Sequence, residues 1–105
     1  MTTKKYLEAI QSIKSNQMEI IKRKNADYAN IDDPFSNFKM VESVGISVEQ
    51  GIMVRVMDKV SRINNLLQRE GKVVDEKITD TLDDLSNYAD ILQAYLKEYN
   101  NNLIK

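Results

Sequence analysis

Apolar side chains recur at steps of three and four along three long segments of this chain, a spacing that places them on one face of a helix. The segments span residues 3–29, 48–70 and 75–99. Only 3 of the 105 residues are Gly and 1 is Pro, so little interrupts a helix. Long amphipathic helices bury their apolar faces against one another. The pattern therefore predicts one all-α domain built as a helical bundle.

The one proline follows a pair of acids and marks a turn in the sequence. A residue that precedes proline is pushed out of the helical region, so the chain is expected to turn at Asp33 and to form a short helix over residues 34–42. Phe35 and Phe38 are the only phenylalanines and lie three positions apart. We expect them to close one end of the core. The predicted bundle thus has four helices, three long and one short.

Polar residues at the segment ends predict where two of the helices start and stop. Ser47 and Gln50 have the spacing of a reciprocal capping box, which would begin the third helix. Gly71 has the position of the residue that commonly follows a helix end. Asp75 is the expected N-cap of the fourth helix.

The fourth helix carries two apolar strips. The strip expected to face the core contains Leu82, Leu85, Ala89, Leu92, Leu96 and Tyr99, and the neighbouring strip contains Tyr88, Ile91 and Tyr95. A four-helix chain of this size offers no obvious partner for the second strip, so the strip predicts a subunit contact. We expect a homodimer or a homotetramer.

Composition narrows the classes of function. Cysteine and histidine are both absent, which excludes disulfides, thiolate catalysis and Cys-based zinc sites. Any metal would be bound mainly by oxygen atoms, which favours Mg²⁺ or Mn²⁺. The net charge of −1 creates no field toward nucleic acid or an anionic membrane, and no apolar run is long enough to span a bilayer. We expect a cytoplasmic protein without a membrane or nucleic-acid partner.

Acidic residues gather on the face of the fourth helix opposite its apolar strips. They are Glu76, Asp80, Asp83 and Asp84. Acids near a helix start are stabilising and commonly form a solvated surface. Like charges at these spacings also repel, and a bound cation such as Mg²⁺ would relieve the repulsion. The stripe is therefore either wet surface or part of a metal site.

A second charged stripe lies on the third helix, opposite its apolar line. Its members, at steps of three and four, are Arg55, Asp58, Lys59 and Arg62. Such a stripe is commonly solvated surface. Its bases could instead pair with the acids of the fourth helix and form an ionic seam, in which desolvation offsets much of the Coulomb gain.

Three sequence stretches carry a family likeness. KNADYANIDDPFSNF, RVMDKVSRINNLL and DEKITDTLDDLSNYADIL together resemble the phage and bacterial nucleotide-modification-associated family, over about residues 24–92. That family is related to the MazG-like, all-α nucleoside triphosphate pyrophosphohydrolases. The likeness implies a MazG-like bundle completed by oligomerisation, with a nucleotide or nucleotide-derived small molecule as the partner.

The MazG-like relatives use acids on two helices to hold Mg²⁺ around a triphosphate. The second acid motif has a counterpart in Asp80, Asp83 and Asp84, with Glu76 one turn earlier. The first motif departs from the pattern, because the two expected glutamates are replaced by Arg55 and Asp58 in one register or by Lys59 and Arg62 in the other, and only Asp58 is acidic. The resemblance thus implies a mixed site, in which acids bind the metal and bases bind phosphate oxygens.

The mixed site gives each residue an expected role. The metal ligands are Asp58, Glu76, Asp80, Asp83 and Asp84, with Glu76 or Asp80 as the general base. The substrate-binding residues are Lys24, Tyr28, Asn37, Phe38, Arg55, Lys59 and Arg62; the turn before Pro34 is expected to bring Lys24, Tyr28 and Asn37 near the acid helix. The implied activity is Mg²⁺-dependent hydrolysis of a nucleoside triphosphate to release pyrophosphate. The alternatives are a nucleotide-binding or sequestering protein without turnover, such as a phage counter-defence factor, and a helical interaction module.

Overall fold

The computed structural model of the protein describes residues 1–28, 32–69 and 77–105. Its α-helices are α1 (Thr3–Tyr28), α2 (Ser36–Lys39), α3 (Val48–Gln68) and α4 (Ile78–Tyr99), with 3₁₀ helices η1 (Met40–Val44) and η2 (Asn101–Ile104). No strand occurs within the described ranges. The prediction of an all-α chain with three long helices and one short one is confirmed.

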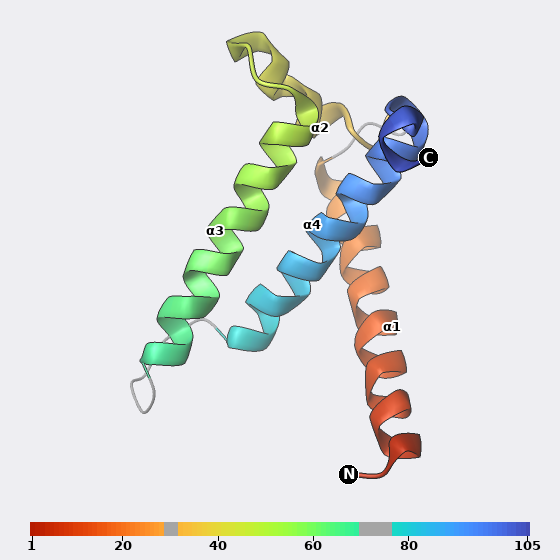
Figure 1. Ribbon diagram of the computed structural model, residues 1–105, viewed down its shortest axis with the longest axis vertical. Coiled ribbons are helices and arrows are strands. Elements are labelled where there is room, and N and C mark those ends of the chain that lie inside the picture. Colours follow the sequence, from red (N-terminus) through yellow and green to blue (C-terminus); the bar gives the residue numbers. More distant parts are fainter. Residues whose placement is uncertain (29–31, 70–76) are drawn as a thin grey trace.

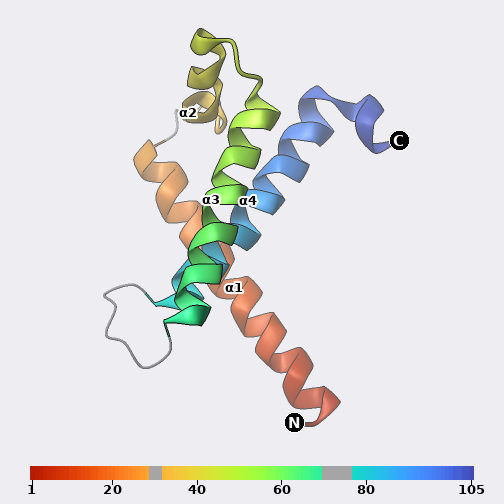
Figure 2. The same cartoon turned by 60° about the vertical axis from the view of Figure 1, so that its left-hand side comes forward.

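The three long helices differ in how closely they associate. Helices α3 and α4 run antiparallel and side by side, and α1 crosses behind α4 (Figure 1). Helix α2 and η1 lie near the start of α3. Turning the molecule shows that the first half of α1 extends beyond the other helices (Figure 2). Only the second half of α1 therefore belongs to the packed part of the chain.

The core lies where α2 meets the start of α3 and the end of α4. Val48, Ile52 and Tyr95 are its buried apolar members, and Phe35, Phe38, Tyr88, Ile91 and Leu92 pack against them. The rings of Phe35 and Tyr95 meet edge to face at a centroid distance of 5.3 Å. This arrangement is favourable because the positive edge of one ring meets the negative face of the other. The prediction that the phenylalanines close one end of the core is confirmed.

The assignment of the two apolar strips on α4 was wrong in part, since Leu92 of the strip expected inside does pack against the core and Leu85 and Leu96 are half-buried. Tyr95 is buried, and Tyr88 and Ile91 pack against the core. Leu82, from the strip expected inside, is 43% exposed, and Ala89 and Tyr99 are exposed as well. The phenylalanine rings before α3 cover the aromatic strip and set the rotation of α4. The strip that predicted a subunit contact is thus covered within the chain.

One predicted helix cap is present in the structure and another is not. Ser47 and Gln50 form the predicted capping box. The Ser47 hydroxyl accepts from the backbone N–H of Gln50, and the Gln50 side-chain oxygen accepts from the backbone N–H of Ser47, both at 3.1 Å. Helix α4 begins at Ile78 after the extended Lys77, so the prediction of an N-cap at Asp75 was wrong. Asp75 and Gly71 themselves lie outside the described residues.

Three polar side chains connect the turn before α2 to the end of α4. Lys39 Nζ lies 2.7 Å from Asp33 Oδ2 and donates to the Tyr99 hydroxyl at 3.2 Å. Asp33 Oδ1 also accepts from the backbone N–H of Phe35 at 2.9 Å. The Lys39 ammonium, and then this backbone donor, lower the pKa of Asp33 below its ordinary value. The contacts hold the aromatic rings of the turn over the core.

Candidate functional site

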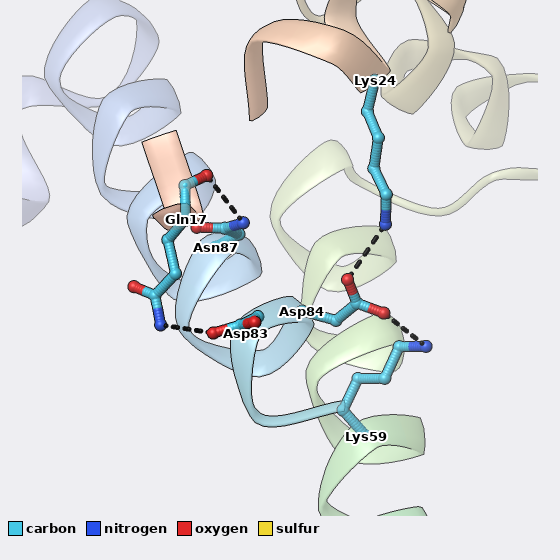
Figure 3. Close-up of polar contacts among 6 residues, drawn as sticks. All are labelled: Gln17, Lys24, Lys59, Asp83, Asp84 and Asn87. Carbon is cyan, nitrogen blue, oxygen red and sulfur yellow. Dashed lines mark hydrogen bonds and ion pairs between the residues drawn. The ribbon is translucent and has the colours of Figure 1, made fainter. Parts of the chain in front are cut away.

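One carboxylate of α4 bridges two lysines from different helices (Figure 3). Asp84 Oδ1 lies 2.9 Å from Lys24 Nζ on α1, and Asp84 Oδ2 lies 3.3 Å from Lys59 Nζ on α3. The side chains of Lys59 and Asp84 are only 17% and 22% exposed, whereas Lys24 is half exposed. Asp84 therefore links all three long helices. The prediction that Lys24 approaches the acid helix is confirmed.

The neighbouring acid points the other way and belongs to a polar cluster with α1. Asp83 Oδ1 accepts from Gln17 Nε2 at 3.1 Å, and Gln17 Oε1 accepts from the Ser86 hydroxyl at 3.1 Å. Asn87 Nδ2 donates to the backbone carbonyl of Gln17 at 3.2 Å (Figure 3). Gln17 and Asn87 are both buried. These hydrogen bonds fix where α1 crosses α4.

The acid stripe of α4 is therefore divided among different partners. Asp83 and Asp84 leave α4 on opposite sides (Figure 3), and Asp80 is exposed. Within residues 1–28, 32–69 and 77–105, no three acidic side chains lie together in a group that could hold a metal ion. Glu76, predicted as a ligand and as a base, lies outside these ranges. The described acids alone thus do not form the predicted magnesium cage.

The charged face of α3 lines an open cleft of about 510 Å³. Its lining residues are Arg55, Asp58, Lys59, Ser61, Arg62 and Asn65. Among these described lining residues three are cations and one is a carboxylate, so this part of the cleft has a positive balance. The chemistry of the lining suits an anion with several oxygens.

Lys59 connects the cleft with the bridging carboxylate. Its side chain lines the cleft while its ammonium lies 3.3 Å from Asp84, which fixes one cation at the edge of the cleft. One ion pair of the proposed seam between α3 and α4 is thus present. Ser61 and Asn65 were missed by sequence reasoning, although they continue the charged stripe from Asp58 at steps of three and four.

Phe38 and Asn37 are not among the described residues that line the cleft. Phe38 packs edge to face on Tyr88, with ring centroids 6.4 Å apart, and contributes to the core. Asn37 is exposed on α2. Tyr28 ends α1, and its side chain lies outside the described part of the structure. The structure thus joins Lys24, Lys59 and Asp84 directly and gathers Arg55, Asp58 and Arg62 beside them.

Two further findings bear on identity. No helix within the described ranges combines the length and apolar character needed to cross a membrane. Comparison with family models, with curated proteins and with solved structures finds no match in any of the three.

Proposed function

We propose that the chain binds the phosphate groups of a nucleotide in the cleft along α3. The observation that carries the proposal is the set of three cations around one open cleft, in a chain whose net charge is −1. A local positive balance on a nearly neutral protein attracts an anion to that place and not to the whole surface. The three family-like stretches of the sequence support a nucleotide as the source of the phosphates.

Each basic side chain suits a different part of a polyphosphate. The planar guanidinium groups of Arg55 and Arg62 match two phosphate oxygens at once, whereas the Lys59 ammonium acts as a point charge. Ser61 and Asn65 add hydrogen-bonding groups without charge. Lys24, which is half exposed and paired with the same carboxylate as Lys59, can turn toward a phosphate beyond the cleft.

Mg²⁺, or Mn²⁺ in its place, is proposed to reach the cleft on the nucleotide. The described acids do not fit a metal held by the protein alone, because Asp84 is paired with two lysines and Asp83 with Gln17. Among the described residues that line the cleft, Asp58 is the one carboxylate. Mg²⁺ is commonly held by one or two carboxylates together with substrate phosphates, which is an arrangement that Asp58 fits. The ion would neutralise phosphate charge there.

The same proposal includes three further points: that the chain belongs to the nucleotide-modification-associated family, folds as a MazG-like bundle, and acts in the cytoplasm as a homodimer or homotetramer. Pyrophosphate release is the activity that the resemblance implies, with Glu76 or Asp80 activating water. Asp80 is exposed on α4, and no observation favours turnover over binding. Binding is therefore the function that the geometry supports best, and hydrolysis is an outcome of its test.

The test incubates the pure protein with ordinary and modified nucleotides, with and without Mg²⁺, and measures both complexes by native mass spectrometry and released pyrophosphate. Replacing Arg55 and Arg62 together by Gln should weaken binding about tenfold or more, since charge-assisted hydrogen bonds contribute about 1.5–3 kcal/mol. Arg23→Gln is the matched control, because Arg23 is exposed on α1 outside the cleft.

Two results would overturn the proposal. One is the absence of any nucleotide complex, which would favour a helical interaction module. The other is binding that the paired Arg→Gln change leaves unaltered, which would place the nucleotide elsewhere. Pyrophosphate release by the wild type would extend the proposal from binding to hydrolysis.

A further inference from the structure

The first half of α1 exposes an apolar face. Tyr6, Leu7, Ile10 and Ile13 are between 37% and 58% exposed. At 100° per residue they share one side of the helix with Gln17, which is buried against α4. The same face is therefore covered in the second half of α1 and uncovered in the first, where α1 extends beyond the other helices (Figure 2).

One flank of α3 is also apolar and exposed. Met53, Met57 and Val60 are between 42% and 59% exposed and lie within about a sixth of the helix circumference. The buried line of α3, which contains Val48 and Ile52, lies on one side of this flank, and the cleft residue Ser61 borders the flank on the other side. We call the residues Met53, Met57 and Val60 the methionine flank. Helix α4 covers the buried line and leaves the methionine flank open.

The amount of exposed surface is too large for a compact chain of this mass. The accessible surface is 8203 Å², whereas a folded monomer of 12.1 kDa exposes about 6,000 Å². The radius of gyration is 16.0 Å, against about 13 Å for a compact domain of this length. The excess of about 2,000 Å² falls in the range that one partner buries in an obligate dimer, about 1,000–2,500 Å².

We propose that a second copy of the chain covers both the exposed face of α1 and the methionine flank, in one two-fold symmetric dimer. Exposed apolar faces on two helices promote aggregation unless their partner is always present. Another copy is the one partner that is present whenever the chain is made. A net charge of −1 adds little repulsion between two copies.

The charges beside the α1 face favour a protein partner over a membrane. The exposed half of the helix carries Lys4, Lys5 and Lys14 with Glu8 among them, which is fewer bases than the roughly four to eight of a cluster that binds anionic lipid. The proposal assigns a surface that does not overlap the cleft lining. It therefore stands or falls independently of nucleotide binding.

Sedimentation velocity at micromolar concentration tests the proposal. The wild type should sediment as a dimer, and Ile10→Glu and Met57→Glu should each raise its dissociation constant by at least about 100-fold, because each would bury an unpaired charge. Val44→Glu is the control: Val44 is 72% exposed on η1 and belongs to neither face. Circular dichroism should show equal helix content in all four proteins, since the changed side chains are exposed.

A second measurement does not depend on the charged variants. The chain has no cysteine, so Ile10→Cys and Val44→Cys each introduce a single thiol. In the dimer, a thiol reagent should modify the cysteine at position 10 at least tenfold more slowly than the one at position 44. Equal rates would contradict the proposed interface even if a charged variant failed to fold.

Three results would overturn the proposal. The first is a wild type that remains monomeric at micromolar concentration. The second is a dimer that either Ile10→Glu or Met57→Glu leaves intact, since both faces should lie in the interface. The third is a monomer that binds vesicles of phosphatidylserine through α1, because the occupant of the face would then be a membrane surface.

Discussion

The two flanks of α3 differ in chemistry although they flank the same buried line. One flank lines the cleft with Arg55, Asp58 and Arg62, and the other is the methionine flank. Both are exposed, and Ile52 between them is fully buried. The difference shows that one helix can hold a phosphate-binding face and an association face on different parts of its circumference.

Truncating a side chain of the buried line between the flanks should have the largest effect on stability. Ile52→Ala deletes a fully buried side chain and leaves a cavity, so we expect a loss of about 2–5 kcal/mol in the free energy of unfolding, measured in urea. Val54→Ala is the control on the exposed side of α3 and should cost less than about 0.5 kcal/mol. Equal losses would mean that α3 does not pack as described.

The contrast extends to α1, whose first half is exposed and whose second half is held by polar contacts. Gln17→Ala removes the side-chain partner of Asp83 and Ser86 and keeps the backbone carbonyl that Asn87 contacts, so we expect a loss of about 1–3 kcal/mol in the free energy of unfolding. The comparison is Gln11→Ala, which changes an exposed residue of the same helix. If the two variants melt at the same temperature, the polar cluster does not anchor α1.

Replacing Asp84, which bridges two lysines beside the cleft, should lower the stability of the protein. Asp84→Asn leaves Lys24 and the partly buried Lys59 without a charged partner, and we expect a loss of about 1–2 kcal/mol in thermal unfolding without metal, allowing for partial solvent screening. Asp80→Asn should have almost no effect because Asp80 is exposed. A gain in stability for Asp84→Asn, together with loss of a Mg²⁺-dependent rise in melting temperature, would instead indicate a metal site at Asp84.

A smaller effect on stability is expected at acidic pH, where the ion pair between Asp33 and Lys39 is lost. The pKa of Asp33 is lower in the folded protein than in the unfolded chain, where it is about 3.9. Its ion pair with Lys39 therefore stabilises the fold above that pH, and the stabilisation is lost as the pH falls through the folded pKa. Asp33→Asn should flatten the pH dependence of unfolding below about pH 4. An unchanged pH profile would show that Asp33 contributes nothing to it.

The helices were predictable from the sequence because apolar spacing and rare breakers are local signals. The capping box at Ser47 and the approach of Lys24 to α4 were also predicted, the second from the turn at Pro34. The rotation of α4 was not, because both of its strips are apolar and the choice depends on the rings of Phe35 and Phe38 packing on Tyr88 and Tyr95.

The candidate site was predictable in part. The charged stripe of α3 follows directly from residue spacing, and the structure gathers it around a cleft. The division of the acids was not visible in the sequence. Whether Asp83 meets a metal or the amide of Gln17 depends on where α1 crosses α4, and that crossing is set by a buried polar residue in an otherwise apolar face.

One sedimentation-velocity experiment with a nucleoside triphosphate tests the separation of the two flanks most directly. Interference optics report the size of the protein, and ultraviolet absorbance reports the nucleotide that sediments with it. We expect the wild type to sediment as a dimer with nucleotide, the paired Arg55→Gln and Arg62→Gln variant as a dimer without it, and Met57→Glu as a monomer with it. If Met57→Glu loses the nucleotide, or if the arginine variant dissociates, the two flanks of α3 do not act independently.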